Sequence, residues 1–353
     1  MGNLNKSVEK PIISVLMPVF NGASYLKNSI GSLQKQTCKD WELLTLDDGS
    51  TDSSLASLQD FASNDSRIRI YSKTNDINGN VALNLKWLCK KEVYGEYCFY
   101  MSQDDEIDAD CFEKLLSRAQ ETHADVVIPN MLLKYADGSM GTWACSYPPN
   151  HDYSLMLDGK NAFYLSCDFS INGFALIRKS LFVDGFYALD NYDSDEYNTR
   201  LQYLHAQKVC FADTTFYYYQ GNPLAVTKLF APKRFRRLLT SLKVAEKFER
   251  VFPKHSKRVK LKIYLMKTYV DILILYFWHH AQLTEFEDEE ARRIFEKFEQ
   301  QVHFRGYRKE VWHELNNYER CFALLYFVFG SCLGMLPIYN LVHRIRKGRL
   351  CVI

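Results

Sequence analysis

The chain has 353 residues, of which 47% are hydrophobic and 24% are charged. That length fits one large domain or a domain with a substantial appendage, and the composition excludes a disordered chain. Because 44 basic residues nearly balance 42 acidic ones, the net charge of +2 does not indicate nucleic acid as a partner. The ten cysteines form no CxxC pair, so reduced thiols are expected rather than a disulfide framework.

The first half of the chain alternates strand-like and helix-like segments, recognised by their apolar spacing. In chain order they are a strand at 12–17, a loop at 18–22, a helix at 25–36, a strand at 41–46, a helix at 52–61 capped by Ser50 or Thr51, a strand at 67–72, a helix at 80–91, a strand at 97–101, a helix at 111–120 and a strand at 124–135 that turns at Asp137-Gly138. Repeated βα units predict an α/β fold with a mostly parallel sheet and helices on both faces. Such folds bind ligands beyond the carboxyl ends of their strands.

Helical patterns replace this alternation beyond Thr227, at residues 234–252, 257–283 and 289–304. We therefore expect one domain at 1–227 and a helical region at 228–353. The polar N-terminus has no apolar signal core, which predicts a cytoplasmic protein. Residues 322–339 carry no charge, barely reach the length of a membrane span, and precede a basic tail. A segment lying on the inner face of the membrane and a helix pair packed on the protein both remain open.

Two pairs of adjacent acids, Asp47-Asp48 and Asp104-Asp105, follow predicted strands. A turn with a helix cap could explain the first pair, and an acidic helix N-terminus could explain the second. Since both pairs lie at the same rim of one sheet, we expect them to share a crevice. Carboxylates suit Mg²⁺ or Mn²⁺, which commonly bridge one or two of them to substrate phosphates.

The segment after the first strand contains neither a P-loop nor a GxGxxG motif, which disfavours a P-loop NTPase or a dinucleotide enzyme. It offers Pro18-Val19-Phe20-Asn21 instead, with an aromatic side chain that could lie against a nucleobase.

Four segments, "SVLMPVFNGASYLKNSIGSLQKQT", "WELLTLDDGSTD", "GEYCFYMSQDDEID" and "DSDEYNTRL", occur in this order. Together they resemble the inverting family 2 glycosyltransferases of GT-A fold, over about Pro11 to Thr227. The resemblance implies transfer of a sugar from a nucleotide-diphosphate donor, such as a UDP-sugar, with Mn²⁺ or Mg²⁺ as cofactor. The implied acceptor is a hydroxyl of a glycan or polyprenyl-linked glycan in bacterial surface polysaccharide synthesis.

The resemblance also assigns residues. It implies that five of them bind the nucleotide-sugar: Pro18, Phe20, Asn21, Asp48 and Asp104. The pair Asp104-Asp105 matches the family's metal-binding motif, and Asp105 is the expected direct ligand of the metal.

This chain departs from the family at two positions. Ser102 stands where many members have another aspartate, and Leu83 stands where an arginine often precedes the residue matching Asn84. Both changes remove charge near the expected diphosphate, so more of the binding falls to Asp105 and the metal.

An inverting transferase needs one general base for the acceptor hydroxyl. Asp193, Asp195 and Glu196 lie at the start of a predicted helix, where acids of a capped helix start are the alternative explanation. Counted from Arg200, the family's catalytic carboxylate falls near Ser194. We choose Asp195 as the base and Glu196 as the second candidate.

A loop, a run of tyrosines and a pair of histidines lie outside these motifs. Asn222 and Thr227 follow a strand-like run, in a loop where the family often contacts metal or phosphate. The residues 217–219, all tyrosine, fit an edge strand, and His279-His280 lack a third metal ligand, which favours a structural role.

Other classes of protein compete with the transferase. A nucleotidyltransferase also uses metal-bound carboxylates, and a non-catalytic carbohydrate- or membrane-binding protein would need only structural acids. Nucleic-acid binding ranks last, because the basic residues alternate with helix core positions.

Overall fold

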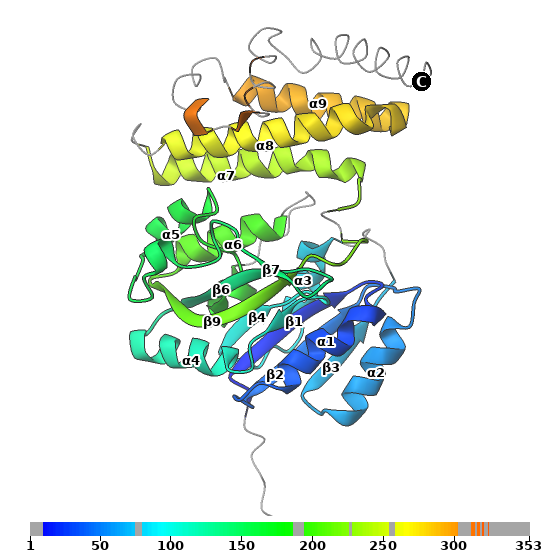
Figure 1. Ribbon diagram of the computed structural model, residues 1–353, viewed down its shortest axis with the longest axis vertical. Helices are drawn as coiled ribbons and strands as arrows, with labels where there is room; N and C mark the ends of the chain where they lie inside the picture. The colour runs from blue at the N-terminus through cyan, green and yellow to red at the C-terminus, as the bar shows by residue number, and fades with distance from the viewer. Residues whose placement is uncertain are drawn as a thin grey trace, which may run out of the picture. The chain divides into compact units, whose positions relative to one another are not determined.

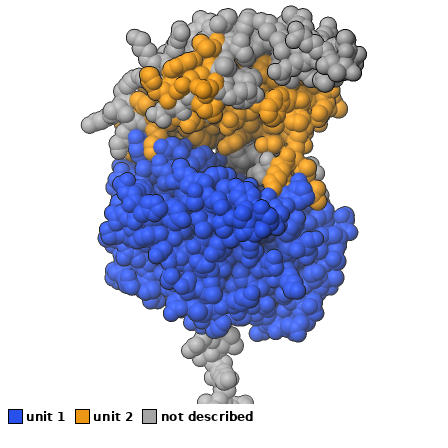
Figure 2. All heavy atoms as spheres, viewed as in Figure 1, with its two compact units in different colours: residues 1–190, 194–223 blue, residues 191–193, 224–353 orange. Residues whose placement is uncertain are grey.

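The computed structural model describes residues 10–74, 80–185, 194–225, 228–253, 258–302, 312–314, 316, 317, 320 and 324. The chain divides into two compact units, which Figure 2 colours separately. Unit 1 comprises residues 1–190 and 194–223, and unit 2 comprises residues 191–193 and 224–353. The boundary expected near Thr227 falls a few residues after Pro223, where unit 1 ends. How the two units divide the function stays a prediction.

Unit 1 is built around one mixed sheet with the strand order β3-β2-β1-β4-β8-β6-β9-β5, and β7 pairs with β6 (Figure 1). Its strands are β1 (Ile13–Val19), β2 (Trp41–Asp47), β3 (Ile68–Ser72), β4 (Tyr97–Tyr100), β5 (Glu106–Ile107), β6 (Val126–Lys134), β7 (Met140–Gly141), β8 (Leu176–Arg178) and β9 (Val209–Tyr219). The strands β3, β2, β1 and β4 are parallel, whereas β8 runs antiparallel to β4 and β6. The carboxyl ends of β1, β2 and β4 therefore meet at one edge of the sheet.

Helices cover both faces of this sheet. They are α1 (Ala23–Gln34), α2 (Ser54–Asn64), α3 (Val81–Cys89), α4 (Cys111–Thr122), α5 (Gly159–Ser166) and α6 (Ser194–His205). Successive strand residues point to opposite faces, so Val15 belongs to the buried cluster under α1, α2 and α4. Leu16 belongs to the other cluster, under α3, α5 and α6. This arrangement confirms the predicted α/β architecture.

Helix α2 starts later than predicted. Its first residue is Ser54 and its N-cap is Ser53, so the caps expected at Ser50 or Thr51 are wrong. The Ser50 hydroxyl instead accepts a hydrogen bond from the Asn21 N–H, and the Thr51 N–H and hydroxyl donate to Asn21 Oδ1. These bonds satisfy polar groups of the loop after β1.

The second acidic pair does not begin a helix. Asp105 is followed by the short strand β5, and α4 starts only at Cys111. The helix-dipole explanation for Asp104-Asp105 is therefore wrong, which leaves the pair in a turn between two strands. The tyrosines of 217–219 lie at the end of β9, which pairs with both β6 and β5 and so is not an edge strand.

Unit 2 is helical, as the sequence predicts, and comprises α7 (Arg237–Val251), α8 (Arg258–His279) and α9 (Glu285–Gln301), with short 3₁₀ turns at Pro232–Arg236, His280–Gln282 and Trp312–Glu314. A capping box between Thr284 and Glu287 starts α9. The His279 ring stacks on Phe230 with 4.0 Å between ring centroids, in keeping with a structural role.

The state of the cysteines and the length of the apolar helices concern the chain as a whole. Cys89, Cys98, Cys111 and Cys210 are buried free thiols, as expected for reduced cysteines. Within the described ranges, no helix combines the length and apolar character needed to cross a membrane. The uncharged segment at 322–339 lies almost entirely outside the described residues, so its membrane contact stays a prediction.

Candidate active site

The turn after β1 forms the first wall of the site. Pro18 and Val19 extend β1 beyond the predicted strand, and Asn21 then takes a left-handed conformation with φ of 49°. Its Oδ1 accepts a 2.8 Å hydrogen bond from the Thr51 N–H, while its own N–H donates to Ser50 Oγ at 2.9 Å. Asparagine tolerates this backbone conformation better than most residues. The turn leaves Phe20 39% exposed at the rim, where it can meet a flat ligand.

Asp48, at the end of β2, is fully buried. One carboxylate oxygen lies 3.0 Å from Lys73 Nζ, and the other accepts a 2.8 Å hydrogen bond from Asn84 Nδ2. Its N–H donates to the Val19 carbonyl oxygen at 2.8 Å, which joins the ends of β1 and β2. Both oxygens of Asp48 are therefore engaged by protein groups.

The acidic turn after β4 forms the second wall. Asp105 is fully buried, and its Oδ1 accepts a 3.0 Å hydrogen bond from the main-chain N–H of Tyr219 at the end of β9. Its Oδ2 is buried too and, among the described residues, meets no donor in hydrogen-bonding geometry. Asp104 accepts a 2.8 Å hydrogen bond from Asn222 Nδ2, so the loop after β9 does reach the acidic turn.

The electrostatics of the turn fit a cation. Burial raises the pKa of Asp105 well above its usual range, and the charge of Asp104 adds to the shift. The N–H of Tyr219 and groups of Ser102 act in the opposite direction. A buried carboxylate with an unused oxygen and an acidic neighbour is stabilised in its ionised form by a bound cation.

The chain supplies few protein ligands for such an ion. In the ranges that the structure describes, no group of three or more His, Cys, Asp or Glu side chains is placed to hold a metal. Asp105, with Asp104 beside it, would therefore hold Mg²⁺ or Mn²⁺ mainly together with ligands from water and a substrate diphosphate, as is usual for Mg²⁺.

Gln103 ties the two walls together. Its Oε1 accepts a 2.8 Å hydrogen bond from the Phe20 N–H, and its Nε2 donates to the Phe20 carbonyl oxygen at 3.0 Å. A Cβ at Gly22 would lie 2.3 Å from Gln103 Oε1, so the glycine makes room for this pairing. The turn that carries the exposed aromatic ring is thereby fixed to the acidic turn.

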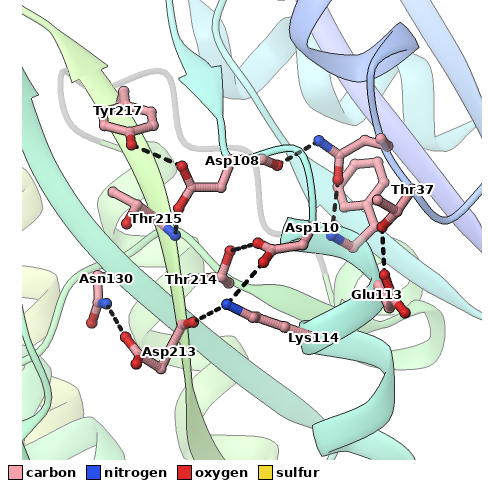
Figure 3. Close-up of polar contacts among 12 residues, drawn as sticks. Thr37, Asp108, Asp110, Glu113, Lys114, Asn130, Asp213, Thr214, Thr215 and Tyr217 are labelled. Carbon is pink, nitrogen blue, oxygen red and sulfur yellow. Dashed lines mark hydrogen bonds and ion pairs between the residues drawn. The ribbon is translucent and has the colours of Figure 1, made fainter.

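A polar network beyond the acidic turn anchors it to β9 (Figure 3). Asp108 accepts hydrogen bonds from the Thr215 N–H at 2.9 Å and the Tyr217 hydroxyl at 2.8 Å. Burial and the bond to Asp108 raise the pKa of Tyr217 to about 12. Asp110 pairs with Lys114 at 2.9 Å, which fixes the first turn of α4. These bonds hold the segment after Asp105 on the strand whose end contacts it.

The two candidate bases occupy the first turn of α6 and differ in their surroundings. Glu196 forms a 3.0 Å ion pair with Arg200, a side chain that is only 2% exposed. Burial raises the pKa of Asp195, and the charge of Glu196 raises it further. Glu196 is thus paired with the buried Arg200 guanidinium, while Asp195 is the carboxylate whose ionised form is disfavoured.

Tyr100 connects Asp195 to the acidic turn. Burial raises its pKa well above the usual range, and the charges of Asp195, Asp105 and Asp104 all add to that shift. Its hydroxyl lies 2.8 Å from Ser102 Oγ, in the acidic turn. Tyr100 is therefore within electrostatic reach of both Asp195 and the two acids.

The structure places the predicted turn after β1, Asp48 and the pair Asp104-Asp105 at the carboxyl ends of neighbouring strands, and Asp195 in the first turn of α6. Their roles stay predictions. Sequence reasoning did not single out Lys73, Gln103 or Tyr100, since each acts through a contact with a distant segment. Asp193 and Thr227 lie outside the described residues.

Known proteins share this fold. TarS of S. aureus, solved in complex with UDP-GlcNAc, is similar with a TM-score of 0.54 and 15% identity, over 83% of this chain and 93% of that one. The mannosyltransferase PcManGT of Pyrobaculum calidifontis, solved with GDP-Man and Mn²⁺, is similar with a TM-score of 0.51 and 14% identity, over 90% and 87%. These likenesses define the fold as that of the GT-A glycosyltransferases.

Sequence comparison gives the family. The model of "Glycosyl transferase family 2" matches residues 14–186. The glycosyltransferase GlyG of Streptococcus pneumoniae serotype 4 is 29% identical over 215 residues, which are 59% of this chain and 70% of that protein. Residues 14–186 form a family 2 glycosyltransferase domain, so the chain is a glycosyltransferase, and the competing classes of nucleotidyltransferase and non-catalytic binding protein are set aside.

Proposed function

We propose that this protein is a metal-dependent inverting glycosyltransferase that uses a UDP-sugar and acts on a hydroxyl of a glycan or lipid-linked glycan, in bacterial polysaccharide synthesis. One observation carries the proposal: Asp105, at the carboxyl edge of the sheet, is fully buried beside Asp104 and, among the described residues, keeps one oxygen that accepts no hydrogen bond. Asp195, in the first turn of α6, would supply the base. A general base and an acidic site for a cation and diphosphate are what single-displacement transfer requires.

The donor would lie across the two walls of the site. The nucleobase of the donor would stack on exposed Phe20 and approach Asp48. The diphosphate would lie at the turn of Asp104 and Asp105. A divalent cation, when bound there, would offset the negative charge that develops on the departing nucleoside diphosphate. Gln103 would keep the base-binding turn and the acidic turn at a fixed separation.

The chemical step needs one proton transfer. The ionised Asp195 carboxylate accepts the proton of the acceptor hydroxyl. At the same time the oxygen of that hydroxyl forms a bond to the anomeric carbon. The bond from that carbon to the β-phosphate oxygen breaks at the same time, and its electron pair leaves with the nucleoside diphosphate. Attack from the face opposite the leaving group inverts the anomeric configuration.

A panel of UDP-, GDP- and TDP-sugars tests the proposal directly. The expected result is release of UDP from at least one UDP-sugar when Mn²⁺ or Mg²⁺ is present, and its loss in EDTA. The anomeric configuration of the product, read by NMR coupling constants, should be opposite to that of the donor. Unchanged release in EDTA, or retention of configuration, would contradict the proposal.

Asp48→Ala should raise the dissociation constant of UDP by about tenfold or more, because a charge-assisted hydrogen bond to the base is lost. Isothermal titration with UDP and NMR titration with uridine measure the effect, and Asp48→Asn provides a variant of similar shape. Weaker binding of both ligands supports a contact with the base. If uridine binding is unchanged and only UDP binding weakens, Asp48 acts on the phosphates through Lys73.

A further inference from the structure

The hairpin formed by β6 and β7 exposes three large apolar side chains. Tyr135, Met140 and Trp143 are 40%, 50% and 51% exposed. Single apolar residues on a surface are ordinary, but several that gather on one hairpin indicate a contact surface. Trp143 lies two residues after the end of β7 and is the largest side chain of the three.

The hairpin is held in one conformation. Gly138 supplies the left-handed turn residue with φ of 83°, and the Ser139 N–H donates to Asp137 Oδ1 at 2.9 Å. The ring of Tyr135 lies over Gly141, where an added Cβ would come within 3.0 Å of it. The Trp143 N–H donates to Ser146 Oγ at 2.8 Å. The exposed indole is therefore carried by a pre-organised backbone.

Trp143 is one of three side chains that form an aromatic shelf, which we define as Trp143, Tyr218 and Phe174. The rings of Trp143 and Tyr218 lie 5.9 Å apart, and those of Tyr218 and Phe174 lie 5.6 Å apart. Phe174 stacks on fully buried Phe216 with 4.0 Å between ring centroids. The shelf is thus anchored in the core of unit 1 at one end and exposed at the other.

The chain neighbours of two shelf residues lie against the segments that carry the acids. Tyr218 precedes Tyr219, whose N–H donates to Asp105. Phe174 follows Gly173, and a Cβ on that glycine would lie 3.6 Å from Thr199, one turn of α6 beyond Asp195. The shelf is therefore continuous with the acidic turn through β9 and with the candidate base through the segment before β8.

We propose that the aromatic shelf binds a pyranose ring of the acceptor. The inference rests on the proposed function, because the acceptor hydroxyl must come to the base while the donor occupies the acidic turn. One face of a pyranose presents C–H groups, which pack on the electron-rich face of an aromatic ring, while the hydroxyls project from the ring edge. A flat, half-exposed indole that packs on Tyr218, the residue before the one that binds Asp105, fits that mixture of apolar and polar surface.

Saturation-transfer NMR on the full chain tests the proposal with three probes: methyl β-D-glucopyranoside, methyl β-D-galactopyranoside and methyl N-acetyl-β-D-glucosaminide. At millimolar concentration, with UDP and Mn²⁺, we expect saturation on the ring protons of at least one of them. Trp143→Ala should lower that signal about fivefold or more, and Trp143→Phe should retain most of it. Met140→Ala, on the same hairpin, is the matched control and should behave as the unaltered protein does.

Separate readouts distinguish the two proposals. UDP binding and donor hydrolysis by water should be equal in Trp143→Ala and the unaltered protein; if the unaltered protein shows neither, the proposed function fails, whatever the pyranosides do. Equal saturation in Trp143→Ala, or none in an unaltered protein that binds UDP, overturns the shelf. A change of sedimentation coefficient in Trp143→Ala without a change in pyranoside binding also overturns it, because the surface then joins two copies of the chain.

Discussion

Replacing Asp105 by asparagine is expected to lower metal-dependent transfer by at least about 100-fold and to leave the protein folded. The variant keeps an oxygen for the Tyr219 N–H but loses the negative charge and the second oxygen that a cation would use. The acids that follow, Glu106, Asp108 and Asp110, are bound to Lys134, Tyr217 and Lys114, so they do not replace the lost carboxylate. Ser102, where many relatives have another aspartate, offers no charge to compensate.

The same substitution should stabilise the protein when metal is absent. The pKa of Asp105 is raised in the folded state, so its ionisation opposes folding as the pH rises through the unfolded value. Neutral asparagine removes this cost, and the Tm of the metal-free variant at neutral pH should exceed that of the unaltered protein. A structural ion pair would give the opposite sign.

Activity with Mn²⁺, activity in EDTA and Tm with and without Mn²⁺ measure these effects. The matched control is Asp110→Asn, which changes a carboxylate paired with Lys114 in the same stretch of chain and should keep its activity. Full turnover by Asp105→Asn, or by the unaltered protein in EDTA, would remove the metal from the mechanism.

The strands and helices of unit 1 could be predicted because their signals are local. Apolar runs such as that of β2 and the helical spacing of Leu26, Ile30 and Leu33 need no knowledge of the rest of the chain. The predicted caps at Ser50 and Thr51 failed for the opposite reason. Their bonds go to Asn21, about thirty residues earlier, and a tertiary contact of this kind overrides a local preference.

Some residues of the candidate site could be predicted from local signals, and others could not. Asp48, Asp104 and Asp105 could be singled out because acids that follow strands of one sheet gather at its edge. Gln103 could not, since its amide is meaningful only when it meets the peptide of Phe20, 83 positions away. Ion pairs also escaped prediction: the sequence shows Glu196 four residues before Arg200, but not that the guanidinium is buried.

That burial separates the two candidate bases, and substitutions of each should show it. Asp195→Asn should lower kcat by about 10²- to 10⁴-fold, the usual contribution of a general base, and leave UDP binding unchanged. Glu196→Gln should keep most of the activity but lower the Tm, because the buried Arg200 guanidinium loses the negative charge with which it pairs. Donor affinity by calorimetry, kcat at saturating donor and thermal unfolding report the three quantities.

The pH profile of activity gives a second test of the same assignment. The base works only when ionised, so activity should be present above the raised pKa of Asp195 and fall as the pH drops through it. In Glu196→Gln the charge that raises this pKa is gone while Arg200, which lowers it, remains. The acid limb of kcat should therefore move to lower pH in Glu196→Gln. If Glu196→Gln is instead inactive and Asp195→Asn is active with an unshifted profile, the base is Glu196 and the assignment is wrong by one residue.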